Sequence, residues 1–200
     1  MKSETQAQAN RTSLRFADAA EKHFAFLEAQ GFQRTQSEPA FVRFESSTLF
    51  INIYHGRKSF EIGAELGRRG NAEDEKQPYP MSALLGVAGV PTAKDYRDYA
   101  THTPDGVNEG LGKLAELFRD HVCRNLQNAR LFQLLKEQRQ AWASDFADGV
   151  NLRKARRKLD AAWHAKNYAK VVELLEPLRT DLTSTELKKL EYAKKEIAES

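Results

Sequence analysis

The chain has 200 residues, of which 40% are hydrophobic and 30% charged, and its net charge is +3 at pH 7. This length and composition are typical of one fair-sized or two small globular domains, and they exclude a disordered or fibrous chain. No stretch approaches the run of about 18 apolar residues that a membrane-spanning helix needs. The start, MKSETQAQANRTS, has no apolar segment typical of a secretory signal, and the single Cys123 fits a reducing compartment. We therefore expect a cytoplasmic protein without membrane segments.

The N-terminal part predicts one amphipathic helix. Thr12 or Ser13 can cap its start, and Gly31 stands where a left-handed cap would end it. Its apolar side chains recur at helical spacing, which indicates one buried stripe: Leu14, Ala17, Ala20, Phe24 and Leu27.

From Phe41 onward the apolar period changes to two, which is typical of half-buried strands. The connections at 46–47 and 55–58 are too short for a parallel crossover, so neighbouring strands must run antiparallel. The sequence therefore predicts a three-stranded antiparallel meander. Its inward positions are Val42 and Phe44, then Leu49, Ile51 and Ile53, then Phe60, Ile62, Ala64 and Leu66.

The segment after the meander predicts a loop followed by helices. Residues 67–80 are polar and rich in glycine and proline, which indicates a surface loop. Short helices are expected at 82–88 and around Tyr96 and Tyr99. Thr103, Pro104 and Asp105 form a strong helix start, because the hydroxyl caps and the carboxylate faces the positive end of the dipole.

The C-terminal half is expected to be mostly helical. One stripe runs to residue 126 and another ends at Gly149; Asn151 then caps a new helix, and Asn167 separates it from the next. Thr183 and Glu186 form a capping box that begins the last helix. The fold class is thus α+β: an N-terminal helix on the meander, then a helical half. The expected regions are 1–102 and 103–200, packed together as one compact unit.

Residues that could carry chemistry are scattered. None of the five histidines is spaced with another ligand as a metal site requires, and no nucleophile elbow or phosphate-binding loop occurs. Glu61 and Glu65 share a face of the third strand and could act as an acid–base pair, but polar alternation is what a solvated strand face shows anyway. We therefore expect no catalytic residues, no cofactor and no metal.

Two surfaces remain as candidate binding sites. The first is the sheet face opposite the core, where aromatic rings surrounded by charge suit a protein partner. A competing interpretation is that later helices cover Phe50 and Tyr54, as in a sandwiched sheet. The candidate contacts are Arg43, Glu45, Phe50, Tyr54, Glu61 and Glu65.

The second candidate surface is basic. Between residues 119 and 158 there are ten Lys or Arg against four Asp or Glu, and Arg153, Arg156 and Arg157 fall on one helix face. Such a face could contact phosphates, although no aromatic residues or base-recognition motif accompany it. A solvated helix face explains the same pattern.

Two resemblances follow from the residues. The run from Ala161 through Trp163, Tyr168 and Val171 to Leu178 resembles a single tetratricopeptide-type helical hairpin, without the further copies that a peptide-binding groove needs. Over most of the chain the layout is similar to a family of small bacterial proteins resembling the immunity proteins encoded beside toxins. The segments that carry this similarity are FLEAQGF, FVRFESSTLFINIYHGRKSFEIGAEL, YPMSALL and VVELLEPLRTDLTSTELKKLEYAKK.

The absent catalytic constellation and the aromatic, acidic sheet face predict a non-enzymatic protein-binding function, and the resemblance implies an immunity or antitoxin-like role for it. The alternative function is accessory nucleic-acid binding through the basic stretch 153–158. An enzyme whose site is assembled from residues distant in the sequence remains a third possibility.

Overall fold

A computed structural model describes residues 11–199, without the side chains of residues 147 and 148. The fold is α+β, as expected. The chain divides into two compact units, residues 1–138 and 139–200, and each is described by itself. This division lies later than the expected boundary after residue 102, because helix α5 (Pro104–Leu117) packs against helix α2 (Phe16–Phe24) and belongs with the sheet.

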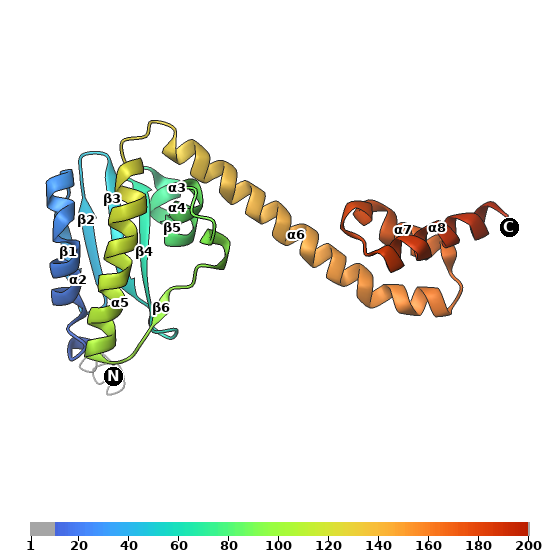
Figure 1. Ribbon diagram of the computed structural model, residues 1–200, viewed down its shortest axis with the longest axis horizontal. Coiled ribbons are helices and arrows are strands. Elements are labelled where there is room, and N and C mark those ends of the chain that lie inside the picture. The colour runs from blue at the N-terminus through green and yellow to red at the C-terminus, as the bar shows by residue number, and fades with distance from the viewer. Residues whose placement is uncertain (1–10, 200) are drawn as a thin grey trace. The chain divides into compact units, whose positions relative to one another are not determined.

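The first unit is built on an antiparallel sheet (Figure 1). The expected meander is its centre, and in the described residues three further strands join it. Strand β1 was missing from the expectation because all six of its side chains are exposed, so its sequence has no apolar alternation. The order is β1-β2-β3-β4-β5, with β6 also pairing with β4. The strands are β1 (Gln33–Glu38), β2 (Phe41–Glu45), β3 (Leu49–His55), β4 (Glu61–Arg68), β5 (Tyr79–Pro80) and β6 (Tyr99–Ala100).

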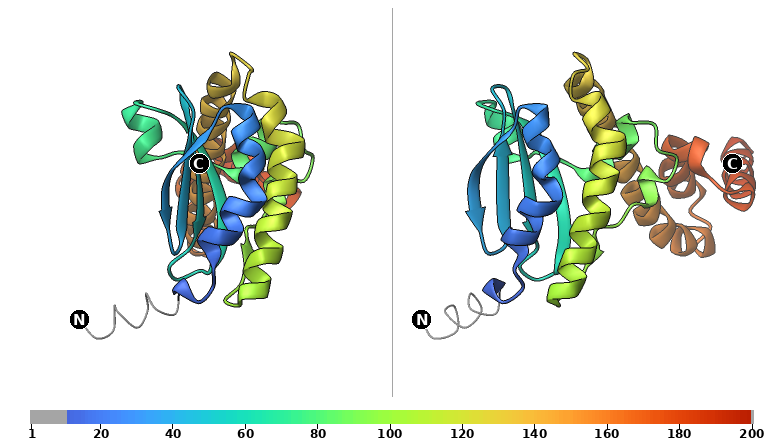
Figure 2. Two further views of the ribbon diagram at one scale, coloured as in Figure 1. Left: turned by 90° about the vertical axis from the view of Figure 1, so that its left-hand side faces the viewer. Right: turned by 60° about the vertical axis from the view of Figure 1, so that its left-hand side comes forward.

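Helices cover one face of this sheet, and α2 and α5 lie side by side on it (Figure 2, left). Their apolar stripes meet the inward side chains of β2, β3 and β4, and each large apolar side chain buried here contributes roughly 1.5–3 kcal/mol. The fully buried members include Phe16, Phe24, Ile51, Ile53, Leu66 and Leu111. The helical elements of this unit besides α2 and α5 are η1 (Ala25–Gln30), α3 (Ala72–Lys76), α4 (Met81–Val87), η2 (Ala93–Asp95), the π-helical turn η3 (Phe118–Val122) and η4 (Cys123–Asn125).

Some of the expected boundaries are confirmed and others are wrong. Helix α2 begins after Arg15, which has a φ of 52° and makes no side-chain cap, and not after Thr12 or Ser13. The expected loop at 67–80 contains α3 and β5.

Gly31 ends η1 at a φ of 83°, and the Thr103 hydroxyl accepts a hydrogen bond from the Gly106 amide at the start of α5. The expected short helix around Tyr96 and Tyr99 is wrong. Tyr99 instead pairs with Ile62 in the sheet, because a strand there extends the apolar face of β4.

Phe60 also differs from the expectation. It was assigned to the inward face of the third strand, but its φ is 56° and its side chain is 42% exposed. The residue lies before β4 and closes the β3–β4 turn, where its ring contacts those of His55 and His102. A left-handed conformation is unfavourable for an aromatic residue, so the turn and not side-chain preference sets this backbone.

The second unit contains the C-terminal part of α6 (Leu131–His164), then α7 (Tyr168–Leu175), η5 (Glu176–Asp181) and α8 (Ser184–Ala198). The expected helix end at Gly149 and the expected cap at Asn151 are wrong, because α6 continues through both. A glycine costs a helix interior only about 1 kcal/mol, which does not end a long helix. The expected break at Asn167 is confirmed, since its side chain accepts a hydrogen bond from the Lys170 amide.

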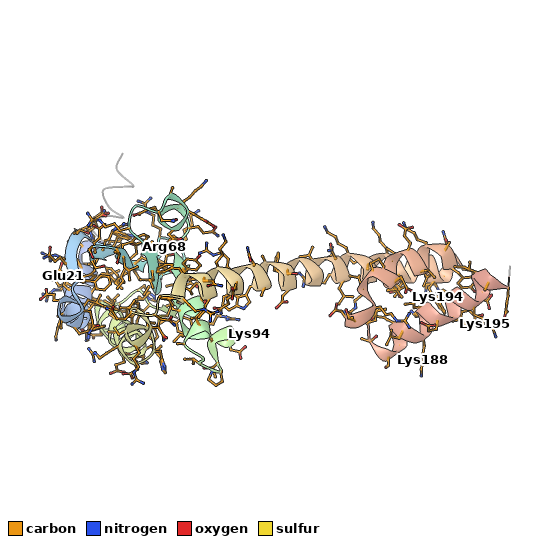
Figure 3. All side chains as sticks on the ribbon, turned by 90° about the horizontal axis from the view of Figure 1, so that it is seen from above. Glu21, Arg68, Lys94, Lys188, Lys194 and Lys195 are labelled. Carbon is orange, nitrogen blue, oxygen red and sulfur yellow. The ribbon has the colours of Figure 1, made fainter. Side chains whose placement is uncertain are left out.

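Three helices enclose the core of the second unit. Trp163, Tyr168 and Tyr192 pack edge to face beside it, with ring centroids 5.7–6.2 Å apart. The expected capping box of Thr183 and Glu186 is present at the start of α8. Helix α8 also carries lysines along its length, three of which are labelled in Figure 3. The buried core residues are Leu159, Ala162, Val171, Leu175, Leu190 and Ala193.

Candidate functional site

The sheet face opposite α2 and α5, here called the outer face, carries all six residues singled out as candidate partner contacts. Cross-strand pairing arranges three rows across β2, β3 and β4, and paired residues project to the same side. The rows are Glu45–Phe50–Gly67, Arg43–Asn52–Glu65 and Phe41–Tyr54–Gly63. Glu61, two residues before Gly63 on β4, extends the same face beside β6.

Two aromatic rings of β3 lie over glycines of β4. A Cβ atom built at Gly67 would lie 2.3 Å from Cζ of Phe50, and one built at Gly63 would lie 2.3 Å from Oη of Tyr54. Neither distance is possible for real atoms, so the rings occupy the space that side chains on β4 would need. The two glycines therefore let Phe50 and Tyr54 lie down across the neighbouring strand.

One end of the outer face is formed by Arg43, Glu45 and Phe50, and we call it the paired half because its charges are balanced. The Arg43 guanidinium lies 3.9 Å from the centroid of the Phe50 ring, a cation–π contact. It also bonds Glu45 at 2.7 Å and Glu75 of α3 at 2.9 Å, while Arg69 contacts Glu45 at 3.3 Å. Two arginines thus face two carboxylates.

Phe50 was one of the residues that later helices were alternatively expected to cover. Its ring is fully buried, and the guanidinium of Arg43, which also bonds Glu75 of the later helix α3, stacks on it. Phe50 supports that guanidinium and does not present itself to a partner. Arg43 and Glu45 are largely occupied with each other.

The other end, the acidic half, consists of Tyr54, Glu61, Glu65, Tyr96 and Asp98. Tyr96 and Asp98 come from the segment between η2 and β6. The Tyr54 hydroxyl donates to Oδ2 of Asp98 at 3.4 Å, and the Tyr96 hydroxyl also bonds this carboxylate. Among residues 11–199, none of the three carboxylates forms an ion pair.

Burial and mutual repulsion set the protonation of this half. Partial burial raises the pKa of Glu65 above its ordinary value, and the charge of Asp98 adds to the increase. The pKa of Asp98 is raised by burial and by Glu61. Burial, followed by the charge of Asp98, raises the pKa of both Tyr54 and Tyr96, so both phenols stay protonated and act as donors.

Asn52 stands in the middle row, between the two halves. Its side chain is 8% exposed and hydrogen-bonds to the Glu65 carboxylate, its cross-strand neighbour. The amide oxygen Oδ1 is buried without any hydrogen-bond partner. A buried acceptor without a donor costs free energy.

The acidic half supplies negative charge and hydrogen-bond acceptors. Its phenols are too weakly acidic to act as nucleophiles near neutral pH. Within the described part of the chain, no three metal-ligating side chains gather into a metal site. Two open grooves of this unit lie elsewhere, one beside Arg68 and Arg69 and one beside Glu21 and Arg34.

Tyr96 and Asp98 are the site residues that sequence analysis missed. A helix was expected there, which would have pointed these side chains in different directions. The segment Tyr96 to Ala100 has no alternation of polar and apolar residues that would predict a strand, and its two tyrosines are three residues apart, as on a helix face. What the sequence could not supply is the pairing of β6 with β4, which brings Asp98 to Tyr54.

The alternative phosphate-binding residues lie on exposed positions of α6 in the second unit. Arg156 is engaged there: its Nε and Nη2 atoms contact the two Glu186 carboxylate oxygens at 2.6 Å and 3.0 Å. Its charge is therefore compensated within the unit. Arg153 and Arg157 flank it on the same helix, so the basic face is weaker than the sequence alone suggested.

Comparisons with known proteins add no assignment: no family model, no curated protein and no solved structure matches the chain. No helix within residues 11–199 combines the length and apolar character that crossing a bilayer requires.

Proposed function

We propose that this protein is a non-enzymatic binding protein that recognises a basic protein partner through the acidic half of its outer face. The observation that carries the proposal is the gathering of Glu61, Glu65 and Asp98 beside two phenols without a compensating cation among the described residues. Like charges held together destabilise the free protein, and a cationic partner relieves that repulsion. The similarity to immunity-like proteins suggests a toxin-type partner in a bacterial cytoplasm.

Tyrosines strengthen the proposal. Tyrosine rings at an interface bury a large surface area at a low cost in conformational entropy, and their hydroxyls can form hydrogen bonds with a partner at the same time. Tyr54 and Tyr96 are both partly exposed and held in place by Asp98. Of the six contacts expected from sequence, Tyr54, Glu61 and Glu65 belong to this half, whereas Arg43, Glu45 and Phe50 belong to the paired half.

Site-specific photo-crosslinking tests the proposal. A photoreactive residue at position 61 on the outer face should trap one protein in the host cell, whereas the same residue at position 116 on α5 should not. Both native residues are exposed glutamates, so the two positions are matched. The trapped band should disappear when Asp98→Asn is added. Trapping of the same protein from both positions, or trapping that survives Asp98→Asn, would contradict the proposal.

A further inference from the structure

The continuity of α6 aligns an aromatic side chain with the basic stretch of the second unit. A helix end was expected at Gly149, which would have separated Phe146 from Arg153. Because α6 continues through Gly149, Phe146 lies seven residues before Arg153 and eleven before Arg157, at intervals of two and three helical turns. Residues at these spacings lie on nearly the same side of a helix. The ring and the two guanidinium groups therefore follow one line along α6.

Four exposed cations of α6 have no ion-pair or hydrogen-bond partner among the residues that the structure describes: Arg153, Lys154, Arg157 and Lys158. Together with Phe146 they are called the α6 face. The neighbouring Arg156 does not belong to it, because Glu186 holds its guanidinium. The nearby carboxylate of Asp160 contacts Lys189 of α8 at 3.7 Å. The charge of the α6 face is thus uncompensated.

The whole positive excess of the chain lies in the second unit. Residues 139–200 include thirteen Lys or Arg and ten Asp or Glu, whereas residues 1–138 include eighteen of each. The two units therefore differ in charge, and the second unit is the one that attracts anions.

The ring of Phe146 is an independent observation on the same face. It is 70% exposed, more than any other large apolar side chain of the described residues. A single exposed apolar residue is common on protein surfaces. Here, however, the ring lies in line with cations that have no partner, and the combination of an aromatic ring with uncompensated cations suits a ligand that has both phosphates and flat unpaired bases.

We propose that the second unit binds single-stranded nucleic acid along the α6 face. The four cations contact backbone phosphates, and the ring of Phe146 stacks on one base. Both interactions tolerate any base sequence, because every nucleotide has a phosphate and every base has a flat face. This function is separate from recognition of a basic protein by the first unit.

Other anionic partners fit this face less well. In a duplex the bases stack on one another, which leaves no base for Phe146. A helix that binds a membrane surface inserts its apolar side into the lipid, but the apolar side of this segment, including Ala155 and Leu159, is buried within the second unit. An acidic protein would require an apolar, closely packed centre, whereas cations make up most of this face.

Fluorescence anisotropy of labelled oligothymidylate and oligouridylate, each about 16 nucleotides long, tests the proposal with the full chain. The logarithm of the association constant should fall against the logarithm of the salt concentration with a slope of about −3, since each phosphate contact contributes about 0.7. Arg153→Gln and Arg157→Gln should each reduce the slope by about 0.7. Lys170→Gln is the matched control, because it removes one charge from α7, where Lys170 pairs with Glu173, and should leave the slope unchanged.

Substitutions at Phe146 separate base stacking from charge. Phe146→Leu keeps an apolar side chain without an aromatic face, so it should weaken binding by about fivefold or more and leave the slope unchanged. Phe146→Tyr should bind like the native chain. Circular dichroism verifies that each variant is folded, which is expected because the substituted side chains are exposed.

Three results would overturn the assignment. The first is that neither oligonucleotide binds, even if vesicles containing phosphatidylserine do. The second is that a duplex of the same length binds as tightly as the single strands, or that Phe146→Leu binds like the native chain. The third is a salt slope that Arg153→Gln and Arg157→Gln leave unchanged. None of these results bears on crosslinking from position 61, which tests the proposed function by itself.

Discussion

The ring of Tyr54 lies over Gly63, its partner across the β3–β4 pair, and a Cβ atom at position 63 would fall 2.3 Å from the Tyr54 hydroxyl oxygen and 2.9 Å from Oδ2 of Asp98. The glycine thus makes room for both members of the Tyr54–Asp98 hydrogen bond. The acidic half of the outer face depends on a position that carries no functional group of its own.

Gly63→Ala should therefore destabilise the first unit by about 1–3 kcal/mol, the usual cost of overpacking. Chemical denaturation measures this loss. The double variant with Tyr54→Ala should be less destabilised than the sum of the two single variants, because the ring that clashes with the new Cβ is then absent. Strict additivity of the two changes would show that Tyr54 does not occupy the space above Gly63.

Glu65 should make the stability of the first unit depend on pH. Its folded pKa is raised above the ordinary 4.5, so the folded state binds the proton more tightly than the unfolded state does. Its contribution is fully present below pH 4.5 and is lost as the pH rises through the folded pKa. Glu65→Gln should remove this loss and raise the free energy of unfolding at pH 8 relative to the native chain. Chemical denaturation at pH 4 and at pH 8 measures the free energy of unfolding of both proteins. If the difference between Glu65→Gln and the native chain is the same at both pH values, the expectation is contradicted.

Local signals in the sequence predicted much of this architecture. Thr103 and Thr183 cap helices as expected, and the alternation in β2, β3 and β4 identified the central sheet. Both features depend on residues that are close together in the sequence. Strand β1 was not predicted, because an edge strand with every side chain exposed has no apolar alternation.

The candidate site was only half predictable for a related reason. Alternation placed Tyr54, Glu61 and Glu65 on one face, but Asp98 reaches Tyr54 from 44 residues away through the short strand β6. No local pattern encodes that distance. The burial of Phe50 under Arg43 is likewise a matter of side-chain stacking, which neither hydropathy nor spacing reveals.

In the second unit, Glu186 should control stability in acid. Contacts with Arg156 and Thr183 lower its pKa from 4.5 to about 2. A lowered folded pKa stabilises the folded state above the unfolded value, and this contribution is lost as the pH falls from about 4.5 towards 2. The protection of the α8 amides from hydrogen exchange, measured relative to the intrinsic exchange rate at each pH, should fall over that range.

Glu186→Ala should remove this acid dependence and cost about 1 kcal/mol at neutral pH, the typical contribution of an N-terminal cap. Glu173→Ala is the control, because Glu173 forms an exposed pair with Lys170 one turn away and such pairs contribute little. If the two variants respond to acid alike, the capping box does not control the α8 terminus.

Gly149→Ala should stabilise α6 by about 0.5–1 kcal/mol, because alanine is a better helix former and the nearest atom to its Cβ would be Nη1 of Arg153 at an ordinary 3.6 Å. Gly89→Ala provides the contrast. Gly89 has a φ of 76°, so alanine there should destabilise the protein despite the open space around it. Thermal unfolding compares the two, and a loss of stability in Gly149→Ala would contradict the continuity of α6.

The most direct test of a basic partner at the acidic half is the affinity of the crosslinked protein, once purified, for Glu61→Lys and Glu116→Lys at several salt concentrations. Both substitutions change the net charge by two, one on the outer face and one on α5. We expect Glu61→Lys to weaken binding about tenfold or more at low salt and progressively less as salt rises, while Glu116→Lys leaves it unchanged. Equal affinities for the two variants would contradict binding at this face.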